Sequence, residues 1–119
     1  MDVEKQIIPS QEKLIFFDPK NFDQIITKDE IKRFLKGEHY DIYNLLGAHK
    51  KVIRNIEGIH FSVWAPNAKQ VFLLGEFLDS PLEMKYVEGG IFEIFVPKAK
   101  QEDRYLFEVV SKDGTKQQN

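Results

Sequence analysis

The sequence of 119 residues contains no cysteine. This absence excludes disulfides, a thiolate nucleophile and cysteine-ligated zinc. An excess of one charge is also missing, because 17 basic residues face 19 acidic ones, so no basic footprint for nucleic acid or an anionic membrane is present. No apolar run approaches the roughly 20 residues that cross a bilayer, and the N-terminus does not resemble a signal peptide. The sequence therefore predicts a cytoplasmic protein without nucleic-acid or membrane partners.

Motifs for phosphate binding, nucleophilic catalysis and metal binding are missing as well. Gly89-Gly90 lacks the Lys-Ser/Thr ending of a phosphate-binding loop, and there is no Gly-x-Ser-x-Gly elbow. The spacing of His39, His49 and His60 matches no metal motif. We expect His39 and His49 to make local hydrogen bonds and His60 to lie on the outer face of a strand. The sequence thus predicts no catalytic residue, no metal site and no cofactor.

Aromatic residues are plentiful, with ten Phe, four Tyr and one Trp. Hydrophobic residues make up 42% of the chain and charged residues 30%, which is typical of a folded globular domain. Aromatic side chains favour strands, and the length suits one hydrophobic core. The composition therefore predicts one folded, strand-rich domain.

A short helix is predicted after residue 26. Thr27 and Glu30 have the spacing of a capping box, in which each side chain bonds the backbone N–H of the other residue. Apolar residues at helical spacing follow: Ile31, Phe34 and Leu35. Gly37 provides the stop, and residues 41–47 form a second turn-like segment that also ends in glycine. These signals predict a short helical segment over residues 27–50.

A half-buried strand is predicted over residues 58–65, after a turn at Glu57-Gly58 and before a break at Pro66-Asn67. Its side chains alternate, with Ile59, Phe61 and Val63 on one face and His60, Ser62 and Trp64 on the other. We expect Trp64 to be buried against a second layer, because tryptophan is highly buried on average. If its ring were exposed, its flat face could pack against the apolar C–H face of a sugar.

Three further strands are predicted towards the C-terminus. Residues 70–74 form an apolar run that is too short for a stable helix, which predicts a strand buried on both faces. Residues 91–96 follow the Gly89-Gly90 turn, and residues 105–110 precede a turn at Asp113-Gly114. Short strands separated by glycine and proline are typical of an antiparallel β-sandwich. We assign four segments: an N-terminal extension of uncertain structure (1–26), the helical segment (27–50), the sandwich (51–116) and a truncated tail (117–119).

Several motifs together resemble one family over about residues 31–116. They are Tyr43-Asn44-Leu45-Leu46-Gly47-Ala48-His49, the run from Phe61 through Trp64-Ala65-Pro66-Asn67 to Val71, Gly75-Glu76-Phe77, Pro81–Met84, Gly90–Pro97 and Tyr105–Glu108. This combination is similar to the N-terminal module of bacterial 1,4-α-glucan (glycogen) branching enzymes. Trp-Ala-Pro alone also fits debranching enzymes, whereas Leu-Gly-Ala-His favours branching enzymes.

The resemblance implies an immunoglobulin-like antiparallel β-sandwich of the family-48 carbohydrate-binding (isoamylase N-terminal-like) class, preceded by one or two short helices. In the whole enzyme this module precedes a catalytic (β/α)8 barrel, a glycosyltransferase that cuts an α-1,4 link and rejoins the fragment as an α-1,6 branch. The barrel uses an Asp nucleophile and a Glu acid/base with retention. None of its motifs is in these 119 residues. The expected role is thus a non-catalytic accessory domain that orients the barrel, with α-glucan as a second partner.

Two positions depart from relatives that bind glycans through this fold. Those relatives have a sugar-stacking Trp where this chain has Ser80, and a Lys where it has Leu106. The departures predict weak or absent glycan binding there, and they leave Trp64, Tyr86 and Tyr105 as substitute carbohydrate-binding residues. Two other readings stay open: a regulatory or scaffolding glycan-binding sandwich, and the N-terminal module of a debranching enzyme.

Overall fold

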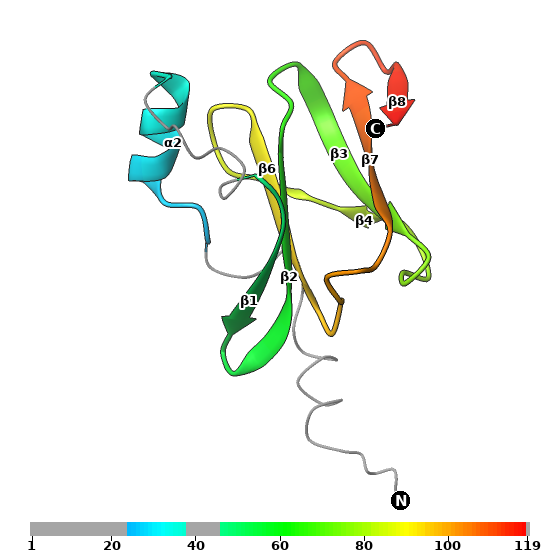
Figure 1. The fold of residues 1–119 in the computed structure, drawn as a ribbon. Coiled ribbons are helices and arrows are strands. Elements are labelled where there is room, and N and C mark those ends of the chain that lie inside the picture. Colours follow the sequence, from blue (N-terminus) through cyan, green and yellow to red (C-terminus); the bar gives the residue numbers. More distant parts are fainter. Residues whose placement is uncertain (1–23, 38–45, 119) are drawn as a thin grey trace, which may run out of the picture.

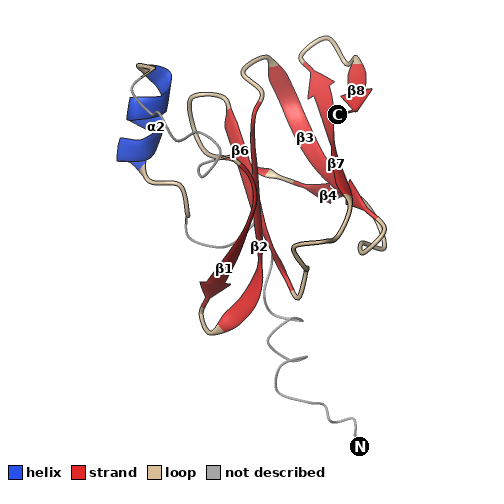
Figure 2. Cartoon of the chain, viewed as in Figure 1, coloured by secondary structure: helices blue, strands red, loops and turns tan. Residues whose placement is uncertain are grey.

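A computed structural model describes residues 24–37 and 46–118, and it consists of two antiparallel sheets with a short helix beside one of them (Figures 1 and 2). The strand orders are β1-β2-β6-β5 and β4-β3-β7-β8. The elements are α2 (Lys28–Leu35), β1 (Gly47–Ile53), β2 (Ile56–Trp64), β3 (Ala68–Gly75), β4 (Leu82–Glu83), β5 (Lys85–Tyr86), β6 (Ile91–Pro97), β7 (Tyr105–Ser111) and β8 (Lys116–Gln118). The predicted mainly β, antiparallel sandwich is confirmed.

The core lies between the two sheets. Its buried side chains come mainly from the inner faces of β2, β3, β6 and β7: Ile59, Phe61, Val71, Leu73, Met84, Phe92, Ile94, Phe95, Val96 and Phe107. Burying a large apolar side chain contributes about 1.5–3 kcal/mol, so this cluster supplies much of the drive to fold. The alternation of Ile59, Phe61 and Val63 that predicted a strand is therefore the pattern of the inner face of β2.

The first hairpin turns earlier than predicted. Arg54 and Asn55 join β1 to β2 with φ values of 55° and 64°, and two consecutive residues with positive φ are typical of a two-residue type I′ turn. The predicted turn at Glu57-Gly58 is therefore wrong, because both residues lie within β2. Gly58 has a different role: a Cβ there would lie 2.8 Å from the Phe95 ring and would collide with the Val96 carbonyl. The glycine allows β2 and β6 to approach closely.

The predicted capping box is confirmed at the start of α2. The Glu30 amide donates to the Thr27 hydroxyl oxygen at 3.1 Å, and the Thr27 amide donates to the Glu30 carboxylate at 3.0 Å. The helix ends before Gly37, which has a φ of 74°. The first strand begins at Gly47, inside the segment expected to be helical, and the turn-like segment at 41–47 lies mostly outside the described residues.

The helix forms a layer on the outer face of the β1-β2-β6-β5 sheet. Ile31 of α2 packs with Ile26, which precedes the helix, and with Ile91 of β6, and all three are buried. Phe34, Leu46 and Val87 extend this second apolar cluster. The layer explains why six consecutive residues of β6, residues 91–96, are buried: one face meets the opposite sheet, and the other meets residues 24–37.

The C-terminal strands form at the predicted positions, but the burial of one of them differs from the prediction. Strands β3, β6 and β7 form where they were predicted. Strand β3 is not buried on both faces, however, because Phe72 and Leu74 on its outer face are only partly buried. The turn at Asp113-Gly114 leads into β8, so most of the segment expected to be a tail is paired with β7.

Candidate functional site

The Gly89-Gly90 turn, between β5 and β6, is the centre of an exposed aromatic site. Both glycines have positive φ, 66° and 87°, a backbone conformation that other residues rarely adopt. Four groups converge on this turn: the Trp64 indole, the Tyr86 hydroxyl, the Ala65 amide and the side chains of Ile31 and Leu35. The turn therefore bonds residues from both faces of the sheet: Trp64 lies on the α2 side with Phe34, and Tyr86 lies on the other side with Phe92.

Trp64, the last residue of β2, is 48% exposed, so the prediction that it is buried is wrong. Its indole N–H donates to the Gly89 carbonyl at 3.0 Å. Its ring meets the Phe34 ring edge-on, with centroids 5.4 Å apart and planes at 79°. The indole thus lies at the border of the layer formed by α2, which contacts it but leaves about half of it open to solvent.

Tyr86 is 56% exposed and lies on the short edge strand β5. Its hydroxyl oxygen accepts a hydrogen bond from the Gly90 amide at 3.4 Å. Its ring packs edge-on against Phe92, with centroids 5.2 Å apart. Trp64 and Tyr86 are therefore both attached to the same turn and both partly open to solvent.

Tyr105 does not belong to this aromatic site. It is the first residue of β7 and pairs with Gly75 at the end of β3, whereas Trp64 precedes the start of β3. At about 3.3 Å per residue, the length of β3 separates the two side chains. The Tyr105 ring is half-buried and packs edge-on against Phe61 and Phe107, with centroids 5.0 Å and 5.3 Å away. The structure thus attaches two of the three predicted residues to one turn, from opposite faces of the sheet.

Ser80 and Leu106 lie away from the Gly89-Gly90 turn. Ser80 is exposed in the loop after β3, and Leu106, which is 46% exposed, pairs with Leu74 on the outer face of the second sheet. A serine and a leucine provide neither a stacking ring nor a cation at these positions.

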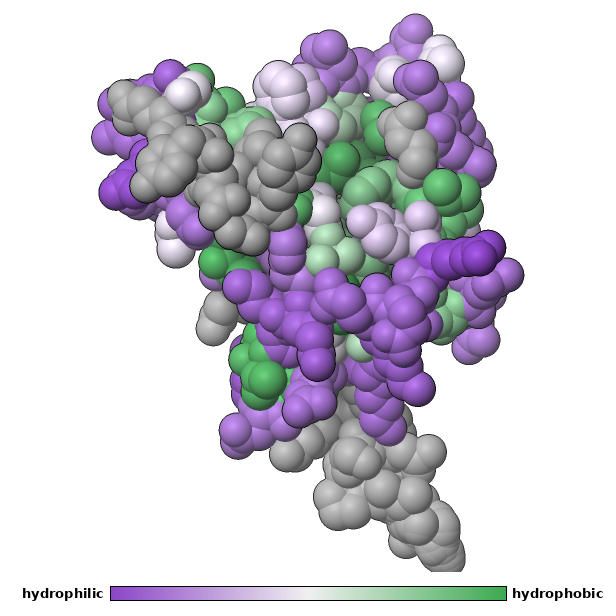
Figure 3. Space-filling view, viewed as in Figure 1, coloured by the Kyte–Doolittle hydropathy of each residue, from purple (hydrophilic) through white to green (hydrophobic). Residues whose placement is uncertain are grey.

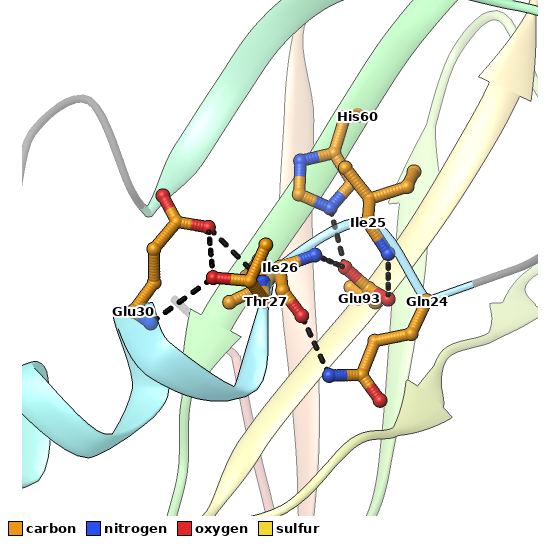
Figure 4. A network of polar contacts seen from close by, with 7 residues as sticks. All are labelled: Gln24, Ile25, Ile26, Thr27, Glu30, His60 and Glu93. Carbon is orange, nitrogen blue, oxygen red and sulfur yellow. Dashed lines mark hydrogen bonds and ion pairs between the residues drawn. The ribbon is translucent and has the colours of Figure 1, made fainter.

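A buried polar network lies beneath residues 24–26 (Figure 4). The Glu93 side chain is fully buried, and its carboxylate accepts hydrogen bonds from the amides of Ile25 at 3.0 Å and Ile26 at 3.2 Å. The His60 Nε2 lies 2.8 Å from the same carboxylate, within hydrogen-bond distance. His60 lies on the outer face of β2, as predicted, but it is only 2% exposed because residues 24–37 cover that face.

Glu93 was not among the site residues predicted from the sequence. The available signal was a single charge inside the apolar run Ile91-Phe92-Glu93-Ile94-Phe95-Val96. A carboxylate at such a position requires several donors, because an unpaired buried charge is very costly. The pattern could thus have indicated a buried polar network, although not which residues supply the donors.

The other histidines and the acidic residues form no catalytic or metal-binding group in the described part of the chain. The His49 Nε2 lies 2.9 Å from the Leu46 carbonyl, which confirms the expected local hydrogen bond, and His39 lies outside the described residues. Among the described residues, His, Asp and Glu side chains nowhere gather in a set of three or more that could hold a metal ion. Within residues 24–37 and 46–118, no helix has the length and apolar character to span a bilayer.

A groove of about 1090 Å³ lies at the other end of the first sheet, between the β1–β2 hairpin and the β6–β7 loop. Its lining includes four lysines and two glutamates: Lys50, Lys51, Lys98, Lys100, Glu57 and Glu102. Hydrophilic residues cover most of the lower part of the face in Figure 3, where this hairpin and loop lie. None of its lining residues is aromatic, so the groove offers no ring for a sugar to stack on and the aromatic site is the better candidate for a carbohydrate.

The chain is similar to several known proteins. The model of the family carbohydrate-binding module 48 (isoamylase N-terminal domain) matches residues 45–119. A 1,4-alpha-glucan branching enzyme GlgB from Francisella tularensis subsp. mediasiatica is 39% identical over 99 residues, which are 79% of this chain and 16% of that enzyme. The enzyme of the same name from Cellvibrio japonicus is 34% identical over 100 residues, or 80% of this chain and 13% of that enzyme. The chain thus spans about a sixth or less of these relatives.

Among solved structures, a pullulanase from Bacillus acidopullulyticus is similar, with a TM-score of 0.51 and 28% sequence identity. The similarity covers 61% of this chain and 9% of the pullulanase. The architecture described above is therefore shared with one part of a much longer protein.

Proposed function

Because this chain belongs to the carbohydrate-binding module 48 family, we propose that it is the N-terminal accessory domain of a 1,4-α-glucan branching enzyme of glycogen biosynthesis. The observation that carries this proposal is the similarity to GlgB enzymes over about four-fifths of the chain. In this proposal the module contributes no catalytic residue. Its main partner is a catalytic barrel in the same polypeptide, which it orients, and its compartment is the cytoplasm, in keeping with the absence of cysteine.

The coding sequence downstream of residue 119 tests this assignment directly. A reading frame that continues into the Asp and Glu motifs of a branching-enzyme barrel supports it. A frame that continues into debranching motifs favours the second candidate, which the structural similarity to a pullulanase supports. A frame that contains neither set overturns both and favours a scaffolding sandwich.

The α-glucan contact of this module is proposed to lie at the aromatic site. Hydrogen bonds to the Gly89-Gly90 turn fix the Trp64 indole, and Tyr86 is attached to the same turn. A ring that is already held in place loses little conformational freedom when a ligand stacks on it. Tyr105 is half-buried between core rings and offers a smaller surface. Because Ser80 and Leu106 replace the stacking ring and the cation of the glycan-binding relatives, we expect the binding to be weak.

Intrinsic fluorescence provides a specific test, since Trp64 is the only tryptophan in the chain. Titration with maltoheptaose is expected to change the Trp64 emission, and Tyr86→Ala is expected to weaken that change. Leu106→Ala is the matched control, because it removes an exposed apolar side chain from the opposite sheet. A titration that leaves the emission and the amide shifts of residues 64, 86, 89 and 90 unchanged would rule out this site.

The two departures at Ser80 and Leu106 allow a gain-of-function experiment. The double variant Ser80→Trp, Leu106→Lys restores the ring and the cation of the glycan-binding relatives. We expect this variant to be retarded more strongly than the parent chain by glycogen in affinity electrophoresis, with Leu106→Lys alone as the control. Strong retardation of the unmodified chain would instead contradict the proposal that its binding is weak.

A further inference from the structure

Residues 24–37, which we call the strap, are attached to the β1-β2-β6-β5 sheet at two places. At the first, the amides of Ile25 and Ile26 donate to the buried Glu93 carboxylate, which His60 also contacts (Figure 4). At the second, α2 lies on the Gly89-Gly90 turn. A Cβ on Gly89 would be 2.8 Å from a Leu35 methyl and 3.2 Å from an Ile31 methyl.

The second attachment is also the border of the aromatic site. The carbonyl of Gly89, beneath Leu35, is the acceptor for the Trp64 indole N–H. Phe34, the residue before Leu35, meets the Trp64 ring edge-on. The orientation of Trp64 is therefore set by contacts with α2 and with the turn on which α2 rests.

The helix cannot maintain this arrangement alone. It has eight residues, and isolated helices shorter than about 12–15 residues are marginal in water. Its docking must therefore come from the apolar contacts of Ile26 and Ile31 and from the bonds to Glu93. The Glu93 carboxylate accepts from two strap amides, and the 2.8 Å contact with the His60 Nε2 holds the same carboxylate from the sheet side.

We propose that Glu93 and His60 are positioning residues that fasten the strap to the sheet, and that the fastened strap holds the Trp64 indole in the orientation presented to a ligand. Strap docking and ligand binding at Trp64 are then linked, and each strengthens the other by the same factor. The link between strap docking and the Trp64 orientation does not depend on which ligand binds. Only its extension to α-glucan rests on the proposed function.

The test is Glu93→Gln in the full chain, with Glu108→Gln as the matched control. The Ile25 and Ile26 amides donate to different oxygens of Glu93, and glutamine offers only one acceptor oxygen, so one of the two amides faces an N–H2 group. Glu108 lies on the opposite sheet, where its carboxylate accepts from Gln118. Without maltoheptaose, we expect amide exchange at Ile25 and Ile26 to accelerate about tenfold or more in Glu93→Gln. We also expect its Trp64 emission to shift to the red and its quenching by acrylamide to increase.

Unchanged exchange at Ile25 and Ile26, or unchanged Trp64 emission despite faster exchange, overturns the inference. Phe34→Leu keeps the test decisive if Glu93→Gln does not fold, because it removes the ring contact and leaves the bonds to Glu93 in place. Its Trp64 emission should shift while exchange at Ile25 and Ile26 stays near the parent value. An unshifted emission in Phe34→Leu overturns the inference.

Maltoheptaose separates this inference from the glucan proposal. If both hold, the sugar slows exchange at Ile25 and Ile26 in the parent chain. If the variants behave as expected but the sugar has no effect on exchange or emission, the strap inference is supported and the glucan site is overturned.

Discussion

The outer face of the β1-β2-β6-β5 sheet is covered by the strap, whereas the outer face of the β4-β3-β7-β8 sheet presents apolar side chains to solvent. On the first, Ile91 and Glu93 of β6 are fully buried. On the second, Leu106 is about half exposed and Leu74 is partly buried. Both outer faces combine apolar and charged residues, so composition alone does not distinguish them.

The difference shows how a charge can be accommodated in a sheet. Glu108 on β7 lies on the open face, where its carboxylate accepts a hydrogen bond from the exposed Gln118 amide. Glu93 on β6 is buried, and contacts with two backbone amides and an imidazole take the place of hydration by solvent. The same residue type is therefore a solvated surface group on one sheet and an attachment point for another segment on the other sheet.

The largest contrast is expected between apolar truncations on the two outer faces. Ile31→Ala, under the strap, should lower the free energy of unfolding by about 2–4 kcal/mol, because it leaves a cavity between α2 and β6. Leu106→Ala should change it by about 0.5 kcal/mol or less, because the side chain is half in solvent. Urea denaturation followed by circular dichroism measures both. Equal costs would mean that the strap contributes little to stability.

The two glycine turns provide the next contrast. Gly89 and Gly114 both have positive φ, but a Cβ on Gly114 would meet nothing within 4 Å. Gly114→Ala should cost about 1 kcal/mol from backbone strain alone. Gly89→Ala should cost about 2 kcal/mol or more, because the added methyl also displaces Leu35. Only the Gly89 variant should shift the Trp64 emission, and a shift in both would contradict the local character of the site.

Removal of the helix cap is expected to have a smaller effect. Thr27→Ala deletes one half of the capping box and should destabilise the chain by about 1 kcal/mol. Asp29→Ala is the control: it breaks the exposed ion pair with Arg33 in the same helix, which is worth about 0.3–0.5 kcal/mol. Thermal unfolding of the two variants checks the order. A larger effect in Asp29→Ala would show that charge, rather than capping, governs the helix.

The smallest effect is expected at Asp113, in the turn before β8. Hydrogen bonds from the Thr115 backbone amide and hydroxyl lower the pKa of the Asp113 carboxyl. A lowered folded-state pKa stabilises the fold above the unfolded pKa, and this contribution disappears as the pH falls through the folded value. Asp113→Asn should therefore be slightly less stable than the parent chain at neutral pH, and the difference should vanish in acid. Denaturation midpoints across pH 2–7 follow this change; a difference that grows in acid would contradict it.

Elements set by local interactions were predictable from the sequence. The capping box of Thr27 and Glu30, the glycine stop at Gly37 and the inner face of β2 depend on residues within a few positions of one another. The Gly89-Gly90 turn was also predicted, although not the groups that gather on it. The first hairpin turn was predicted at the wrong residues because Gly58 resembles a turn residue. The structure instead requires a glycine there because the neighbouring strand β6 leaves no room for a Cβ.

The sequence by itself determined strands β2, β3, β6 and β7, the helix and the absence of cysteine chemistry, because periodicity, capping and composition are local properties. Only the tertiary structure decided which outer face is buried. Glu93 bonds amides 67 and 68 positions away, and the strap that carries them covers His60 yet leaves Trp64 half open. A period-two pattern shows that two faces differ, but burial depends on what packs against each face, and that contact forms only when distant segments meet.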